Sequence, residues 1–182
     1  MEQNPPGVMQ PQRIAIIGNV AAGKTVLARR LAQIYELPLT HVDTLQFLPG
    51  LNMRPYPETI ATLQKIHTEP KWIIDGFGPL DILEQRFQIA DQIIFIDLPV
   101  WRNFWWLTKR QVRNIFSPRP ELPEDCSELS WEHTVRLYKT IIRIHRRMRP
   151  ELLRILARPG LRERTRWVRS MGAWKKVYGR GF

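Results

Sequence analysis

The fold is decided by one stretch near the amino end, RIAIIGNVAAGKTVLAR, which runs from Arg13 to Arg29. Its apolar residues 14–17 predict a buried strand that ends at Gly18. From Val26 onward the apolar residues recur at a helical spacing instead. The stretch therefore predicts a strand, a loop and a helix.

The loop between them has the form G-x-x-x-x-G-K-[ST], with Gly18, Gly23, Lys24 and Thr25 at the fixed positions. In such a P-loop, successive backbone N–H groups curl around phosphate oxygens, which requires glycine where a side chain would block the approach. We expect Lys24 to reach the β- and γ-phosphates of a nucleotide and the Thr25 hydroxyl to hold Mg²⁺. The expected nucleotide-binding residues are Gly18, Asn19, Val20, Ala21, Ala22, Gly23, Lys24 and Thr25.

One departure from the usual pattern is Ala21, because many P-loops carry a third glycine there. The alternative interpretation of the loop is a tight glycine turn between strand and helix that binds no ligand.

Length and composition favour one globular domain. The 182 residues are 43% hydrophobic, and the single cysteine, Cys126, excludes an intrachain disulfide and a cysteine-based zinc site. The amino end, residues 1–12, lacks the features of a signal peptide, and no apolar run approaches the length of a membrane span. We therefore expect a flexible leader at 1–12, a single domain at 13–182, no membrane contact and a cytoplasmic location.

The net charge of +11 is large for this length. A basic surface attracts nucleotides, nucleic acids and anionic lipids alike, so the charge alone does not choose among them. More than half of the excess lies in residues 161–182, where seven basic residues stand against Glu163 and give a net charge of +6. The seven are Arg162, Arg164, Arg166, Arg169, Lys175, Lys176 and Arg180.

Four further strands are predicted, at Leu39–Val42, Trp72–Asp75, Ile93–Asp97 and Arg164–Val168. Helical stretches separate them, which favours a parallel sheet flanked by helices. In open parallel sheets, ligands bind outside the carboxyl ends of the strands, so Asp43 and Asp75 are expected near the P-loop. Asp75 would orient Mg²⁺, or alternatively would only cap the next turn.

The remaining segments are assigned from helix-capping residues, from glycine and proline, and from the periodicity of the apolar residues. We expect a proline-rich loop at Phe47–Pro57, helices at Glu58–His67 and Leu80–Phe87, and a further helix from Val100. A lid is expected at Ser117–Ser130, followed by a long helix that Ser130 caps and Pro150 bends or restarts, and by a last helix capped by Ser170.

Individual side chains in these segments have two interpretations each. Asp43 is an acceptor-binding or general-base residue, or a plain helix cap. His41 is expected to be structural, and Trp101 and Trp105 are expected to pack into the core. Basic residues follow the helical period around the lid, and of these we expect Arg110 and Arg136 to reach phosphate and the others to be solvated. Cys126 is assigned no chemistry.

Five segments together resemble the nucleoside-monophosphate-kinase-like branch of P-loop proteins, which includes adenylate and shikimate kinases. They are GNVAAGKT, HVDTL at His41, WIIDGF at Trp72, FIDLP at Phe95 and RIHRRMRP at Arg143. Within this branch the chain is most similar to a bacterial group labelled DNA topology modulation proteins. The resemblance implies a three-layer α/β fold with a five-stranded parallel sheet of order 2-3-1-4-5, a substrate-binding insertion at about 45–68 and a lid at about 117–130.

The resemblance also implies roles for single residues. Asp75 matches an aspartate that organises Mg²⁺ through water, and Asp43 matches an aspartate that holds the acceptor. Arg110 and Arg136 resemble phosphate-contacting arginines before and after the lid, and Trp106 stands where an arginine stacks on adenine.

One departure concerns the acceptor. The chain has Phe77-Gly78-Pro79 where adenylate kinases have phenylalanine-proline-arginine, so the arginine that grips the phosphate of AMP is absent.

These observations favour an ATP- and Mg²⁺-dependent phosphotransferase in which Lys24, Asp43, Arg110 and Arg136 act on a nucleoside triphosphate and an unidentified small acceptor. ATP is the expected donor, although the sequence leaves the choice between ATP and GTP open; no guanine-reading motif is visible. One alternative is a nucleotide-regulated nucleic-acid-binding protein that uses the basic segment 161–182. Another is an ATP-binding protein without efficient transfer.

Overall fold

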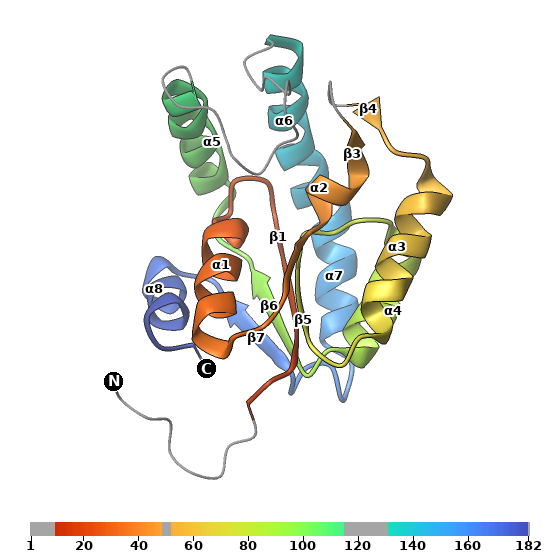
Figure 1. Cartoon of the computed structure of the whole chain (residues 1–182). Coiled ribbons are helices and arrows are strands. Elements are labelled where there is room, and N and C mark those ends of the chain that lie inside the picture. Colours follow the sequence, from red (N-terminus) through yellow and green to blue (C-terminus); the bar gives the residue numbers. More distant parts are fainter. Residues whose placement is uncertain (1–9, 49–51, 115–130, 182) are drawn as a thin grey trace.

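The central strand of the fold is β1 (Arg13–Gly18), which a computed structural model places in the middle of a sheet between two layers of helices (Figure 1). The structure describes residues 10–48, 52–114 and 131–181. The expected leader up to residue 9, the expected lid at 117–130, and with it Cys126 and Ser130, lie outside the described residues. No statement about them follows from the structure.

The sheet contains five parallel strands in the order β2-β5-β1-β6-β7. Apart from β1, these are β2 (Leu39–His41), β5 (Trp72–Asp75), β6 (Gln92–Ile96) and β7 (Thr165–Val168). Counted along the chain, this is the predicted order 2-3-1-4-5, which is therefore confirmed. The carboxyl ends of β2, β5 and β1 lie in register at one edge, because Asp75 pairs with both His41 and Ile16.

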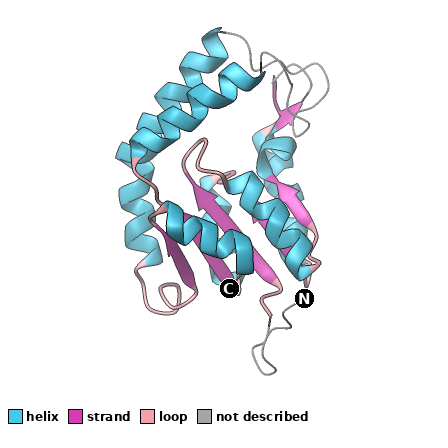
Figure 2. Cartoon of the chain, turned by 90° about the vertical axis from the view of Figure 1, so that its left-hand side faces the viewer, coloured by secondary structure: helices cyan, strands magenta, loops and turns pink. Residues whose placement is uncertain are grey.

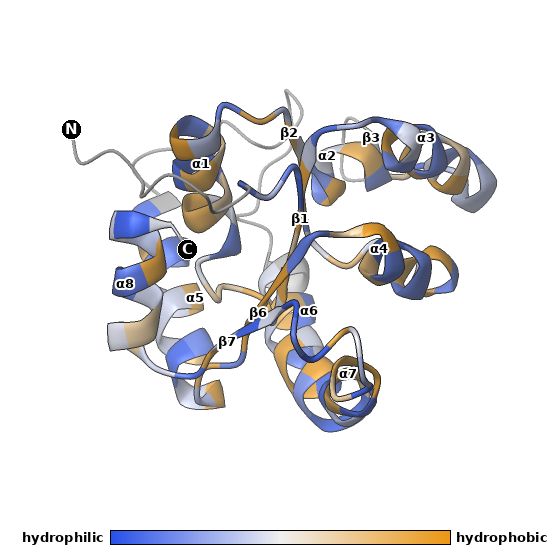
Figure 3. Ribbon diagram, turned by 90° about the horizontal axis from the view of Figure 1, so that it is seen from below, coloured by the Kyte–Doolittle hydropathy of each residue, from blue (hydrophilic) through white to orange (hydrophobic). Residues whose placement is uncertain are grey.

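Helices cover both faces of the sheet (Figure 3). On one side lie α1 (Lys24–Tyr35) and α8 (Met171–Arg180), and on the other α3 (Tyr56–Thr68), α4 (Leu83–Ile89) and α7 (Arg149–Leu156). Alternate residues of β1 belong to the two hydrophobic cores, with Ile14 and Ile16 in one and Ala15 and Ile17 in the other. A strand that is buried on both faces has an unbroken run of apolar residues, and residues 14–17 form such a run.

Two long helices rise beyond the carboxyl edge of the sheet (Figure 2). They are α5 (Val100–Asn114) and α6 (Trp131–Arg143). The rings of Phe104 and Tyr138 stack between them with centroids 5.8 Å apart, and the hydroxyls of Thr108 and Tyr138 are 2.6 Å apart. These contacts hold the two helices side by side above the P-loop.

The segment after β2 differs from its prediction. The strand ends at His41, and a short helix, α2 (Val42–Gln46), begins at once. The expected proline-rich loop contains an antiparallel pair, β3 (Phe47–Leu48) with β4 (Asn52–Met53), and α3 begins at Tyr56, two residues early. Proline at the second position of α3 suits a helix start, because the first amides have no helical partner.

The long helix does restart at Pro150, one of the two alternatives that the sequence left open. A π-helical segment, Ile144–Met148, separates α6 from α7, and Pro150 occupies the first turn of α7, where a missing N–H breaks no helical hydrogen bond. The cap of the last helix is confirmed, since the Ser170 hydroxyl accepts a hydrogen bond from the N–H of Ala173 at 3.1 Å.

The prediction that Trp101 and Trp105 pack into the core is wrong. Their exposed fractions are 58% and 62%, and the guanidinium of Arg102 lies 4.6 Å from the Trp101 ring. The buried face of α5 instead carries Asn103 and Leu107. The helical spacing of the two tryptophans shows that they share a face of the helix. It does not show which face of the helix packs on the P-loop, and that face carries Asn103 instead.

A buried polar pair, Arg86 and His67, joins α4 to α3 on one side of the sheet. Arg86 of α4 is fully buried, and its Nε donates a hydrogen bond to His67 Nε2 of α3 at 3.2 Å. Burial, and then the neighbouring Arg86 charge, lowers the pKa of His67 from 6.5 to about 4. His67 is therefore neutral in the folded protein at neutral pH.

This pair makes folding stability depend on pH. Since the pKa of His67 is lower in the folded than in the unfolded chain, its contribution is complete above pH 6.5 and is lost as the pH falls toward 4. The loss is at most about 3 kcal/mol. We expect His67→Gln, whose amide oxygen also accepts from Arg86, to show a shallower decline in urea-unfolding free energy between pH 7 and 4.5 than the wild type. Identical declines would contradict this assignment.

Candidate functional site

The P-loop runs from the end of β1 into α1, and its glycines meet specific spatial limits. A Cβ on Gly18 would lie 2.7 Å from the Ile96 carbonyl oxygen of β6, so only glycine allows the two strands to approach. Gly23 has a φ of 81° and immediately precedes α1. Ala21 has a φ of 54°, in the left-handed region that favours glycine. Two of the loop residues thus have left-handed backbone, and at Ala21 that conformation is strained.

Two helices hold the loop from above. The side chain of Asn19 accepts a hydrogen bond from the Val20 N–H at 2.7 Å and donates one to the Ile141 carbonyl of α6 at 3.0 Å. Asn103 of α5 donates to the Val20 carbonyl at 2.9 Å. Sequence reasoning missed Asn103. The one indication in the sequence is that Asn103, a polar residue, lies one helical turn before Leu107 and so shares its face of the helix.

Lys24 begins α1 and lies over the loop. Its ammonium donates a hydrogen bond to the Asn19 carbonyl oxygen at 2.9 Å, and the residue is half-buried. The positive end of α1 and the ammonium therefore face the same concave loop, which makes this loop a favourable site for an anion.

Thr25 and Asp75 meet beside the loop. The Thr25 hydroxyl donates to Asp75 Oδ2 at 2.8 Å, and His41 Nδ1 lies 3.1 Å from the same oxygen. Asp75 is 5% exposed, and its other oxygen, Oδ1, is buried without a hydrogen-bond partner among the described residues. His41, which is expected to be structural, lies at the end of β2 in register with Asp75 and contacts this carboxylate.

This arrangement fits a Mg²⁺ ion that a nucleotide brings with it. Mg²⁺ binds oxygen ligands, keeps several waters, and uses one or two protein groups together with substrate phosphates. The Thr25 hydroxyl and the unsatisfied Asp75 Oδ1 are oxygen donors of that kind. A cluster of three or more metal-binding His, Cys, Asp or Glu side chains is not found in the described parts of the chain.

Asp43 lies in the first turn of α2 and is exposed. The described residues provide no hydrogen-bond or ion-pair partner for its carboxylate. The preceding residue, Val42, packs beneath the turn after β5, since a Cβ on Gly76 or Gly78 would lie 3.1 or 3.0 Å from its side chain. Asp43 therefore stands next to that turn, on the side of Asp75 remote from β1.

The two arginines expected at phosphate lie on the two tall helices. Arg110 is half-buried and follows Asn103 by seven residues, which puts it on the same face of α5, about 10 Å beyond the contact with the P-loop. Arg136 is exposed on α6, on the side opposite Tyr138 and Ile141. The structure thus brings Lys24, Thr25 and Asp75 together and leaves Arg136 apart from them.

Aromatic side chains border the start of α1. A Cβ on Gly23 would lie 3.5 Å from the Trp106 ring and 3.2 Å from Trp174 Nε1. Trp174 in turn stacks on Tyr178, with centroids 5.0 Å apart. Trp106 is therefore beside the P-loop, and its role toward a base stays a prediction.

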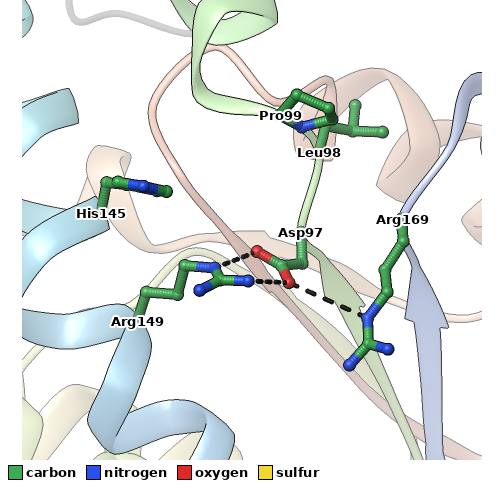
Figure 4. Close-up of a pocket in the computed structure, with 6 residues that line it drawn as sticks. All are labelled: Asp97, Leu98, Pro99, His145, Arg149 and Arg169. Atoms are coloured by element: carbon green, nitrogen blue, oxygen red, sulfur yellow. Dashed lines mark hydrogen bonds and ion pairs between the residues drawn. The ribbon is translucent and has the colours of Figure 1, made fainter.

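A cavity of about 450 Å³ opens at the carboxyl end of β6 (Figure 4). Asp97 lies at its centre and accepts hydrogen bonds from Arg149 Nε at 2.6 Å and Nη2 at 2.9 Å, with Arg169 Nε 4.0 Å away. The hydrogen bond to Asp97 raises the pKa of Arg149. This bidentate pair ties α7 to the sheet, and its charges already neutralise one another.

Neither a protein-family model nor a curated protein matches this sequence. Among solved structures, shikimate kinase from Acinetobacter baumannii in complex with shikimate aligns over 91% of this chain and 90% of its own, with a TM-score of 0.53 and 14% identity. This chain has a P-loop kinase fold. Shikimate kinase from Bacteroides thetaiotaomicron (94% and 96% covered, 14% identity) and a putative kinase from Chloroflexus aurantiacus (71% and 78%, 18% identity) align with TM-scores of 0.47 and 0.42.

None of the described helices of this kinase-like fold is both long enough and apolar enough to cross a membrane.

The strain at Ala21 is measurable. Because left-handed backbone disfavours a Cβ, we expect Ala21→Gly to raise the unfolding free energy by about 0.5–1 kcal/mol. The matched control is Ala32→Gly within α1, where the same exchange should lower it by about 1 kcal/mol. Chemical denaturation of both variants measures the two effects, and a loss of stability at both positions would contradict the strain.

Proposed function

We propose that the protein is an ATP- and Mg²⁺-dependent phosphotransferase with a small-molecule acceptor. The observation that carries the proposal is the Thr25 hydroxyl on Asp75, 2.8 Å apart, beside the Lys24 ammonium on the P-loop. Phosphoryl transfer needs positioning and charge stabilisation more than acid or base groups, and these three side chains supply both at one edge of the sheet. A cytoplasmic location belongs to the same proposal.

On the donor side, the amides of residues 18–25 cradle the phosphates, and Lys24 leaves the Asn19 carbonyl to neutralise the developing charge. Thr25 and Asp75 hold Mg²⁺, which supplies further neutralisation of the phosphates when bound. The Trp106 ring offers a face for the base. Arg110 reaches the phosphates from α5, and Arg136 reaches them from α6.

On the acceptor side, Asp43 and the insertion at about 45–68 receive the second substrate. The exposed Asp43 carboxylate positions an acceptor hydroxyl and accepts its proton as the acceptor oxygen bonds to the γ-phosphorus, while the bond from that phosphorus to the β,γ-bridging oxygen breaks and ADP leaves. The turn Phe77-Gly78-Pro79 lacks the arginine that adenylate kinases use for AMP, which argues against AMP as the acceptor.

Replacing Lys24 tests the proposal directly. We expect Lys24→Ala to reduce nucleotide-dependent phosphate transfer by at least a hundredfold while its circular-dichroism spectrum stays that of the wild type. The control is Lys65→Ala, an exposed lysine of α3 remote from the loop. A folded Lys24→Ala protein with unchanged ATP turnover would exclude a transferase at this site.

Asp75→Asn separates a metal role from a plain turn-capping role. The amide still accepts from Thr25 but loses the charge that attracts Mg²⁺, so we expect ATP to bind at least tenfold more weakly in the presence of Mg²⁺ and equally well with EDTA. Isothermal titration calorimetry under both conditions measures this difference. Equal affinities for wild type and variant in Mg²⁺ would favour the capping role.

The second candidate function, nucleic-acid binding by residues 161–182, has one supporting observation: Lys175, Lys176 and Arg180 are exposed on α8. Residues 161–182 also include β7 and the buried Val177, so deleting the segment would remove part of the sheet.

A double variant, Lys175→Gln with Lys176→Gln, is therefore the appropriate test of this candidate. If α8 binds DNA, the variant should weaken binding and reduce its salt dependence. Unchanged binding to duplex DNA in a filter or gel-shift assay would exclude that role for α8.

A further inference from the structure

Arg86 is a buried cation without an acidic partner. It is fully buried on α4, and no described carboxylate lies within ion-pair distance of it. Its Nη1 donates to the Gly76 carbonyl at 2.8 Å and its Nε to His67, whereas its Nη2 has no hydrogen-bond partner in the described parts of the chain. Buried charges are normally paired, so this arrangement needs an explanation.

The charge is present at neutral pH. Burial lowers the pKa of Arg86 only to about 10, so the guanidinium stays protonated. Burial, and then the Arg86 charge, lowers the pKa of His67 to about 4, so His67 is neutral. The pair therefore carries one net positive charge inside the protein. Asp75, one residue before Gly76, is directed to Thr25 and His41 instead.

The guanidinium lies directly behind the turn that follows β5. A Cβ on Gly78 would lie 3.3 Å from Arg86 Nη2. Both glycines of the turn have positive φ, 115° at Gly76 and 69° at Gly78. The Arg86 hydrogen bond to the Gly76 carbonyl therefore fixes a turn that only glycines adopt easily.

The turn contains two unused backbone donors. The N–H of Gly76 donates to the Ile16 carbonyl at 3.0 Å, but the N–H groups of Phe77 and Gly78 have no acceptor among the described residues. Phe77 and Gly78 are each half-buried, so this part of the turn is not enclosed by the core. Successive free amides in a glycine turn attract anions, and a cation behind them strengthens that attraction.

The turn also lies where a second substrate would be bound. It follows Asp75, packs on Val42 next to Asp43, and occupies the carboxyl edge of the sheet beside the strand that carries the P-loop. If the turn binds an anionic group of the acceptor, the rest of the acceptor would therefore lie between Asp43 and Lys24.

We propose that Arg86 and the amides of Phe77 and Gly78 form a binding site for an anionic group of the acceptor, a carboxylate or a phosphate. This proposal rests on the phosphotransferase function proposed above. Arg86 is a positioning residue: it acts through the turn, supplying from inside the protein the charge that an arginine at position 79 would supply from the surface.

Inorganic phosphate is the probe, titrated by calorimetry into protein whose P-loop is saturated with Mg²⁺ and the non-hydrolysable analogue AMP-PNP. We expect one phosphate per wild-type chain, at least tenfold weaker binding by Arg86→Met, and intermediate binding by Arg86→Lys, which keeps the charge. Arg154→Met removes an exposed arginine of α7 and should bind as the wild type does. A folded Arg86→Met protein that binds phosphate with unchanged affinity would overturn the proposal.

A measurement on the wild type covers the case in which Arg86→Met does not fold. With AMP-PNP bound and ionic strength matched, phosphate and acetate should each raise the melting temperature above its value in chloride, and the larger shift identifies the preferred anion. Equal melting temperatures in all three salts would overturn the proposal.

Failure of the proposed function is distinguishable from failure of this inference. In Lys24→Ala, with the P-loop site disabled, phosphate binding at the turn should persist with an unchanged Kd and should be lost in the double variant with Arg86→Met. Loss of phosphate binding in Lys24→Ala alone would assign the anion to the P-loop and overturn the proposal.

Discussion

The hydrogen bond from the Thr25 hydroxyl to Asp75 Oδ2 is the interaction on which the arrangement of the site depends. It joins the first turn of α1 to the end of β5, although the two residues are 50 positions apart. Because β5 lies between β1 and β2, the same carboxylate also meets His41. One buried acid therefore fixes the P-loop, the second strand and the turn after β5 relative to one another.

The parts that sequence reasoning predicted are those that local pattern specifies. The P-loop, the strand order and the position of Asp75 follow from motif spacing and from alternating strands and helices. The buried face of α5 did not follow, because the spacing of Trp101 and Trp105 is helical on either face. Asn103 and the His41 contact depend on pairings between distant segments, and Arg86 in a solvent-free core has no sequence signature at all.

The large positive charge is distributed in ways that composition does not reveal. Part of it is used inside the fold: Arg149 neutralises Asp97, and Arg164 donates to the backbone carbonyls of Gly160, Gln88 and Ala90. Arg86 is fully buried, and no ion pair to it is found among the residues that the structure describes. The basic carboxyl-terminal segment is consequently a structural part of the sheet and its cover, and only some of its charges face solvent.

The P-loop is also connected to the two helices that rise above it. Asn103 of α5 donates a hydrogen bond to the Val20 carbonyl, and the Asn19 side chain donates one to the Ile141 carbonyl of α6. Trp106 of α5 adds an apolar connection, since its ring lies beside the loop and packs against the core below α1. The loop is therefore joined to α5 by a polar and an apolar contact and to α6 by an asparagine side chain, so its position depends on both helices as well as on β1 and α1.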